Sequence, residues 1–192
     1  MIKRICVFCG SNSGRGGKYE AMAATLGHCL AERGLELVFG GGKVGLMGVI
    51  ADAVLERGGK VIGVIPEDLV KKEVAHTGLS DLKVVASMHE RKALMARLSD
   101  GFVALPGGYG TLDEFCEILT WAQLGLHQKP CGMLNVDGYF DLFLKFVERS
   151  VAEGFVAAEH RDLLLVSDEP KALLDGFADY EPVDLDKWLK KP

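Results

Sequence analysis

The sequence has no long hydrophobic run of the kind that a membrane protein needs. No stretch of its 192 residues approaches the ~20 consecutive apolar residues of a membrane-spanning helix, and the start, MIKRICVFCG, is too short for a signal peptide. It also has no low-complexity tract; hydrophobic residues make up 48% and charged residues 26% of the chain, which is ordinary globular usage. We therefore expect a soluble, cytoplasmic protein that does not bind membranes.

The sequence has no excess of positive charge. Its formal net charge is −5, and its lysines and arginines are scattered rather than clustered. Sequence-independent binding to a nucleic-acid backbone needs a basic surface, so we expect no nucleic-acid partner. Small ligands or other proteins remain as the expected partners.

Cysteine and histidine patterns for disulfides or metal sites are also missing. The five cysteines are an odd number spread through apolar segments, which is typical of reduced core thiols. Cys6 and Cys9 spell C-x-x-C, but they lie within a predicted strand, whereas the redox motif opens a helix. The five histidines show no metal-ligand spacing. We expect neither a disulfide nor a bound metal.

Short apolar segments alternate with amphipathic helical segments along the whole chain. Apolar strands without polar alternation, separated by helices, are typical of a parallel sheet covered on both faces. We therefore predict a Rossmann-like, doubly wound α/β fold in one domain over residues 1–192. The tail 183–192 is polar apart from Trp188 and is either frayed or docked through that indole. Helices are expected at 18–33, 46–57, about 88–98, about 112–124, 139–153 and after Pro170, and strands start near residues 5, 36, 60, 82, 101, 130 and 163.

Three glycine-rich turns follow predicted strands, at 10–14, 40–48 and 106–111. Ligands of open α/β sheets lie at the carboxyl ends of the strands, where these turns are expected. Glycine lets backbone amides approach an anion, and the N-terminus of the helix that follows adds partial positive charge. A single such turn is equally well explained as a tight connection. Three together favour a phosphorylated ligand.

The middle turn also fits two other nucleotide motifs in part. Gly40, Gly42 and Gly45 satisfy G-x-G-x-x-G, with an acid at 67 or 68 roughly where a ribose-binding residue would lie. However, this turn follows the second strand, whereas the dinucleotide fingerprint follows the first. Val44 stands where a Walker loop needs Ser or Thr for magnesium, so an ATPase is not expected. An NAD-dependent oxidoreductase remains an alternative.

Two capping-box spacings precede predicted helices. Thr111 and Glu114 have the S/T-x-x-E spacing, which predicts a structural role for this glutamate, although its carboxylate would also lie at the mouth of the third glycine-rich turn. Ser87 and Glu90 repeat the spacing. This second box places Arg91 and Lys92 in the first turns of the next helix, where cations oppose the helix dipole. That cost favours a functional role, such as contact with an anionic ligand.

Three segments carry a resemblance to a known family: PGGYGTLDE at 106–114, GGGKVGLMG at 40–48 and SMHERKALM at 87–95. They closely resemble the LOG family of cytokinin riboside 5′-monophosphate phosphoribohydrolases, formerly labelled lysine decarboxylase-like. The likeness extends from the first strand through TWAQLG and KPCGMLNVDGY to AEGFV. It implies a Rossmann-like homodimer without a cofactor that hydrolyses the N-glycosidic bond of AMP or N6-prenylated AMP, releasing the base and ribose 5-phosphate.

The resemblance also implies roles for individual residues. Glu114 and Arg91 would be catalytic, which distinguishes an enzyme from a non-catalytic nucleotide-binding module. No lysine lies in a recognisable Schiff-base context, so decarboxylation with pyridoxal phosphate is not expected. Substrate contacts would come from Lys92, from the phosphate-binding Gly107, Gly108, Tyr109, Gly110 and Thr111, from Gly41, Gly42 and Ser11 in the other turns, and from Glu73 and Thr120.

Overall fold

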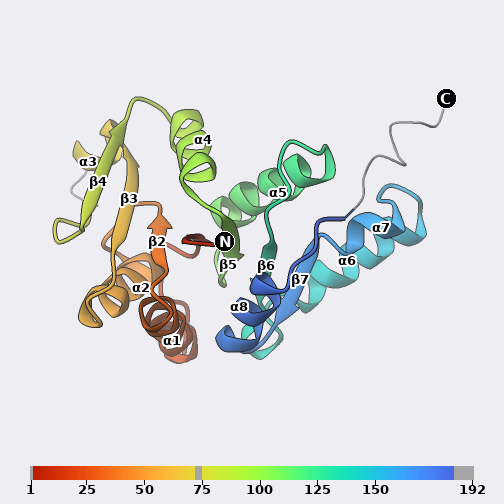
Figure 1. Cartoon of the computed structure of the whole chain (residues 1–192), viewed down its shortest axis with the longest axis horizontal. Coiled ribbons are helices and arrows are strands. Elements are labelled where there is room, and N and C mark those ends of the chain that lie inside the picture. The colour runs from red at the N-terminus through yellow and green to blue at the C-terminus, as the bar shows by residue number, and fades with distance from the viewer. Residues whose placement is uncertain (1, 72–74, 184–192) are drawn as a thin grey trace.

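The part of the chain that the structure describes forms one parallel β-sheet of seven strands in the order β4-β3-β2-β1-β5-β6-β7 (Figure 1). The computed structural model describes residues 2–71 and 75–183. The strand order reverses between β1 and β5, which is the topology of a doubly wound fold and confirms the predicted fold class. The strands are β1 (Arg4–Phe8), β2 (Glu36–Phe39), β3 (Val61–Pro66), β4 (Asp81–Val85), β5 (Gly101–Ala104), β6 (Cys131–Leu134) and β7 (Leu164–Ser167).

Helices cover both faces of the sheet. In Figure 1, α1 and α2 lie together with α8 on one side, and α4 and α5 lie on the other. None of the helices in the described part of the chain is long and apolar enough to cross a lipid bilayer. The helices are α1 (Lys18–Glu32), α2 (Gly45–Glu56), α3 (Glu67–Lys71), α4 (Met88–Leu98), α5 (Tyr109–Gln123), α6 (Asp141–Ala152), α7 (Ala158–Arg161) and α8 (Pro170–Ala178), with a 3₁₀ turn η1 at Val136–Gly138.

The central strands are apolar throughout because each face packs against its own hydrophobic core. Ile5 and Val7 of β1 contribute to the core under α1, α2 and α8. The intervening Cys6 and Phe8 point into the second core, under α4 and α5. Successive side chains of a strand alternate between the two faces, so a strand buried on both sides shows no polar alternation. Burial on both faces is therefore the reason that the strands stand out in the sequence as short, uninterrupted apolar segments.

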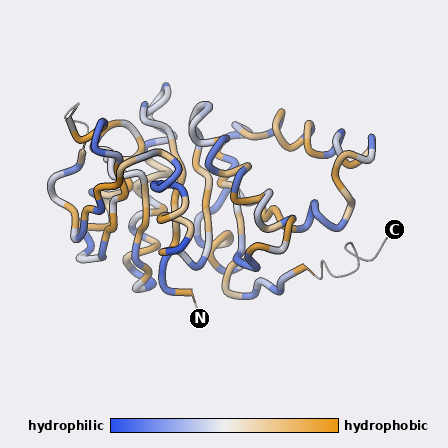
Figure 2. The backbone as a smooth tube through the Cα atoms, turned by 90° about the horizontal axis from the view of Figure 1, so that it is seen from above, coloured by the Kyte–Doolittle hydropathy of each residue, from blue (hydrophilic) through white to orange (hydrophobic). Residues whose placement is uncertain are grey.

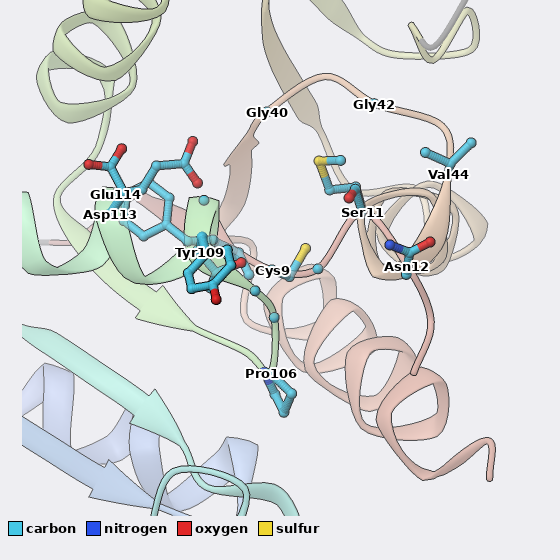
Figure 3. A pocket seen from close by; sticks show the side chains of 18 of the residues that line it. Cys9, Ser11, Asn12, Gly40, Gly42, Val44, Pro106, Tyr109, Asp113 and Glu114 are labelled. Atoms are coloured by element: carbon cyan, nitrogen blue, oxygen red, sulfur yellow. The ribbon is translucent and has the colours of Figure 1, made fainter. Parts of the chain in front are cut away.

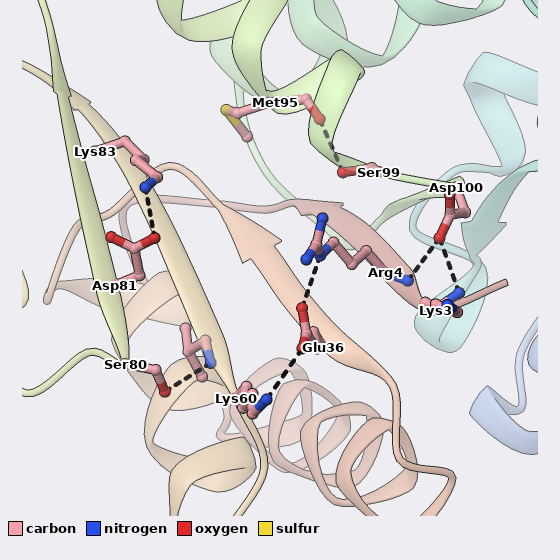
Figure 4. Close-up of polar contacts among 11 residues, drawn as sticks. Lys3, Arg4, Glu36, Lys60, Ser80, Asp81, Lys83, Met95, Ser99 and Asp100 are labelled. Atoms are coloured by element: carbon pink, nitrogen blue, oxygen red, sulfur yellow. Dashed lines mark hydrogen bonds and ion pairs between the residues drawn. The ribbon is translucent and has the colours of Figure 1, made fainter.

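Polar contacts join the amino-terminal ends of four neighbouring strands (Figure 4). Asp100, which precedes β5, accepts hydrogen bonds from the backbone amides of Lys3 at 2.8 Å and Arg4 at 3.0 Å. Arg4 in turn donates to Glu36 at 2.7 Å and lowers the pKa of that carboxyl, and Lys60 lies 3.6 Å from its other oxygen. The amino-terminal edge is thus held by its own charged side chains. The carboxyl-terminal edge is where the glycine-rich turns lie.

The start of α5 differs from the prediction. The helix begins at Tyr109, not at residue 112, and its N-cap is Gly108, which has no side chain with which to cap. Thr111 and Glu114 therefore lie inside the helix, and the capping box predicted for them is wrong. The second capping box is confirmed in part: Ser87 Oγ accepts from the Glu90 amide at 3.1 Å, while Glu90 Oε2 accepts from the Ala86 amide at 2.9 Å and not from that of Ser87. The helices α3 and α7 were not predicted, and residues 184–192 of the tail lie outside the described residues.

Two helix glycines provide a test of the packing between α1 and α2. A Cβ on Gly27 would lie 2.8 Å from Ala53 Cβ and 2.9 Å from the Ile50 carbonyl oxygen, whereas one on Gly176 in α8 would meet nothing within 4 Å. Both changes to alanine gain helix propensity, up to ~1 kcal/mol. We expect Gly176→Ala to stabilise the protein and Gly27→Ala to destabilise it by ~1–3 kcal/mol through overpacking. Urea unfolding measures both; equal stabilisation would contradict the close helix contact.

Candidate active site

A cavity of about 730 Å³ opens at the carboxyl-terminal ends of the central strands. It lies where the strand order reverses between β1 and β5, and all three glycine-rich turns contribute to its wall. In Figure 3, Ser11 with Asn12, Gly40 with Gly42, and Pro106 with Tyr109 surround the same space. Of the residues predicted for the site, the cavity lining includes Ser11, Gly42, Arg91, Gly107, Gly108, Tyr109, Gly110, Thr111 and Glu114.

The third turn presents a row of backbone amides to the cavity. The first hydrogen bond of α5 runs from the Leu112 amide to the Gly108 carbonyl at 3.2 Å. The N–H groups that precede it, those of 108–111, have no acceptor within the helix. They lie at a helix N-terminus, which carries partial positive charge. This end of the cavity is suited to an anion such as a phosphate group.

The first and third turns are in direct contact, and glycine is required where they meet. The Gly10 amide donates to the Pro106 carbonyl at 3.0 Å. A Cβ on Gly107 would lie 2.1 Å from Thr111 Oγ1 and 2.9 Å from the Gly10 nitrogen. No side chain fits in that space, so the backbone itself forms the wall of the cavity.

Arg91 reaches the cavity from α4 as a buried cation. Its Nε donates to the Val64 carbonyl at 3.2 Å, and its Nη2 lies 3.3 Å from Glu114 Oε1. The two side chains are only 10% and 9% exposed, so this is a buried ion pair. A Cβ on Gly40 would lie 2.0 Å from Arg91 Nη2. Gly40 thus leaves room for the guanidinium, a role that the sequence motif did not show.

Glu114 has a carboxylate oxygen without a hydrogen bond. Although Oε1 lies within ion-pair distance of Arg91, it is buried and has no hydrogen-bond partner among the described residues. Burial raises the pKa of this carboxyl, and the charge of Arg91 offsets the rise only in part. An oxygen of this kind can accept a hydrogen bond or a proton from a bound ligand or water, and a raised pKa suits a general base.

Lys92 contacts two carboxylates of α5, of which that of Asp113 belongs to a residue of the cavity lining. Its Nζ lies 3.2 Å from both Asp113 Oδ2 and Glu117 Oε2, and its side chain is 13% exposed. Burial alone would lower the pKa of Lys92, but the two carboxylates outweigh it and raise the pKa. Lys92 is not part of the cavity lining, so it bridges α4 and α5 in this structure.

Two further predicted residues, Gly41 and Thr120, are not part of the cavity lining. Gly41 adopts φ of +73°, and its carbonyl accepts a hydrogen bond from the His76 amide at 2.9 Å. It therefore contributes to the conformation of the second turn. Thr120 is exposed further along α5, where its hydroxyl donates to the Cys116 carbonyl. Glu73 lies outside the described residues.

Other residues of the cavity were not predicted for the site. An apolar wall of the cavity is suited to a flat ring or an alkyl group. Tyr139 also lines the cavity and donates its hydroxyl hydrogen to the Gly107 carbonyl at 2.6 Å. Its place in KPCGMLNVDGY indicated family resemblance but no contact. The apolar wall consists of Val44, Met47, Ile65, Leu69 and Met88.

The raised pKa of Glu114 predicts how folding stability depends on pH. The carboxyl is protonated more readily in the folded chain than in the unfolded chain, so its contribution is fully present below the unfolded pKa and is lost as pH rises through the folded pKa. A glutamine at this position does not titrate. We therefore expect the stability of Glu114→Gln relative to the wild type to increase over this pH range. Chemical unfolding at a series of pH values measures the difference; a decrease would contradict the raised pKa.

Solved structures with the same fold come from distant proteins. A molybdenum cofactor binding protein from Rippkaea orientalis aligns with a TM-score of 0.70 at 20% identity, over 93% of this chain and 97% of that protein. The molybdenum cofactor carrier protein of Chlamydomonas reinhardtii aligns with a TM-score of 0.70 at 22% identity, over 94% of this chain and 100% of that protein. At this level of identity the likeness shows the fold alone.

Sequence relatives are much closer. The probable cytokinin riboside 5′-monophosphate phosphoribohydrolase LOGL9 of Oryza sativa subsp. japonica is 52% identical over 95% of this chain and 80% of its own length. LOG7 of Arabidopsis thaliana, a cytokinin riboside 5′-monophosphate phosphoribohydrolase, is 50% identical over 94% of this chain and 83% of its own length. A family model described as "possible lysine decarboxylase" matches residues 47–177. The chain therefore belongs to the LOG family, the family of the cytokinin riboside 5′-monophosphate phosphoribohydrolases.

Proposed function

We propose that the protein hydrolyses the N-glycosidic bond of AMP or N6-prenylated AMP, releasing the free base and ribose 5-phosphate. The observation that carries the proposal is the buried Arg91–Glu114 ion pair, in which one carboxylate oxygen has no hydrogen-bond partner among the described residues and lies beside a glycine-rich helix N-terminus. The helix end suits the phosphate and the apolar wall suits the base. The names of the LOG relatives support the same substrate class.

Glu114 has the properties needed at the reacting carbon. When the bond between base and ribose breaks, the bonding electrons leave with the base and the sugar becomes similar to an oxocarbenium ion. A carboxylate nearby stabilises this cation and accepts the proton that the attacking water loses. The base leaves with one proton and the sugar gains a hydroxyl group, so the reaction consumes only water and needs no cofactor.

Arg91 is assigned a positioning and charge-balancing role at the ribose 5-phosphate. Arginine side chains stay charged and are poor acids, but they hold phosphate and carboxylate groups in fixed geometry. Its hydrogen bond to Val64 and its contact with Glu114 fix the guanidinium before substrate enters. For Lys92, Thr120 and Glu73, substrate contact rests on the family resemblance; Lys92 would have to leave its carboxylate partners to make one.

The alternative functions have less support. A non-catalytic binding module has no need of a buried carboxylate with a raised pKa. An NAD-dependent oxidoreductase would carry its glycine motif after β1, whereas Gly40 and Gly42 follow β2. A decarboxylase using pyridoxal phosphate needs a lysine for the Schiff base, and within the described residues the cavity lining contains none.

We further propose that the protein acts in the cytoplasm as a homodimer. The helix α6 buries none of its residues fully, and Leu142 and Phe146 are 80% and 66% exposed, with Phe155 beyond it 84% exposed. Figure 2 shows hydrophobic stretches at this outlying end of the molecule. Exposed apolar surface of this kind is typical of a protein partner surface. Trp121 of α5 is not part of this exposed surface, since it packs partly against the second core.

The catalytic assignment is tested by Glu114→Gln. General acid–base help is worth ~10²–10⁴-fold, so we expect the variant to lose that factor in release of adenine from AMP and of isopentenyladenine from isopentenyl-AMP. Chromatography of the released base measures the rate. Glu32→Gln, at an exposed carboxylate near the end of α1, is the control and should match the wild type. A Glu114→Gln rate within about tenfold of the wild type would contradict the assigned role.

A further inference from the structure

The peptide between Gly107 and Gly108 lies at the base of the proposed phosphate site. A peptide unit is planar, so its carbonyl and its N–H point in opposite directions. Glycine on both sides leaves the unit free to rotate, because neither residue has a Cβ to restrict it. If it turned over, the Gly108 N–H would be lost to a phosphate at this helix end and the Gly107 carbonyl oxygen would take its place, which would repel the phosphate. The turn alone does not fix its own orientation.

A side chain from a distant part of the sequence holds this peptide. The Tyr139 hydroxyl donates a hydrogen bond to the Gly107 carbonyl oxygen at 2.6 Å. The bond holds the carbonyl toward Tyr139, so the N–H of the same planar unit is turned the opposite way. Tyr139 lies between η1 and α6, in the connection after β6. It is therefore anchored outside the turn that it holds.

The Tyr139 ring is itself fixed by its surroundings. It packs edge-on against Tyr19 at a centroid distance of 5.6 Å and against Phe140 at 5.1 Å. The connection that carries it has Asp137 at φ of +50°, a conformation in which only a few non-glycine residues occur, and Lys18 of α1 forms an ion pair with this aspartate. Ring contacts and ion pair both tie the connection to the start of α1. These contacts place the partly exposed Tyr139 ring beside the third turn.

We propose that Tyr139 is a positioning residue, which sets the Gly107–Gly108 peptide so that its N–H faces the substrate phosphate. This inference rests on the proposed function, since it assumes a phosphate at the N-terminus of α5. Tyr139 acts through the backbone and does not touch the reacting bond. Its hydroxyl therefore contributes to binding of phosphorylated ligands and not to the chemical step.

Tyr139→Phe tests this role because it removes the hydroxyl group and keeps the ring contacts. A hydrogen bond contributes about 0.5–1.5 kcal/mol net, so we expect the Kd for ribose 5-phosphate to rise by a factor of about 2 to 13. The KM for AMP should rise by a similar factor at unchanged kcat. Titration calorimetry measures the first quantity and steady-state release of adenine measures the second. A structural defect alone would not separate KM from kcat in this way.

Tyr180→Phe is the matched control. Tyr180 lies beside a second cavity at the opposite edge of the sheet, with Ile2 and Pro130, and should leave both quantities unchanged. Unchanged ribose 5-phosphate affinity in Tyr139→Phe would overturn the positioning role, as would a fall in kcat with constant KM. No binding of ribose 5-phosphate by the wild type would overturn it as well. If the proposed function itself were wrong, the wild-type protein would bind ribose 5-phosphate but would release no base from AMP.

Discussion

The site depends on a buried pair of opposite charges, Arg91 and Glu114. Moving charges out of water is costly, and such a pair often adds little to stability compared with apolar residues of similar size. The chain nevertheless accommodates the pair. Gly40 has no Cβ and so leaves space for the guanidinium, and the Val64 carbonyl accepts a hydrogen bond from it. A costly, incompletely hydrogen-bonded pair at the wall of a cavity is better explained by chemistry than by folding.

The fold supplies the place for this pair but not its function. Parallel strands bring all their carboxyl ends to one edge, and the reversal of strand order between β1 and β5 opens a space there. A molybdenum cofactor binding protein and a molybdenum cofactor carrier protein share this architecture at 20% and 22% identity. What separates a hydrolase from a carrier on the same fold must be found in side chains and turns. Here those are the glycine-rich N-terminus of α5 and the carboxylate of Glu114.

Much of the architecture was predictable because it follows from local patterns. Strands such as Ile5–Phe8 are apolar on both faces, and the turns after them are marked by glycine. The start of α5 was missed because a glycine N-cap leaves no side-chain signal, while Thr111 and Glu114 have the spacing of a capping box.

Local sequence also cannot show contacts between distant residues. The need for Gly40 beside Arg91, the carboxylate partners of Lys92 and the bond from Tyr139 to the third turn all arise only when separate elements meet.

In the proposed function, a backbone phosphate site and a buried carboxylate act together on a nucleoside monophosphate. The most direct measurement compares kcat/KM of the wild-type protein for AMP and for adenosine, by release of adenine. Two charge-assisted hydrogen bonds at about 1.5 kcal/mol each correspond to about 100-fold, so we predict at least that preference for AMP. Similar values for the two substrates would contradict the account, because they would leave the glycine-rich helix end without a role.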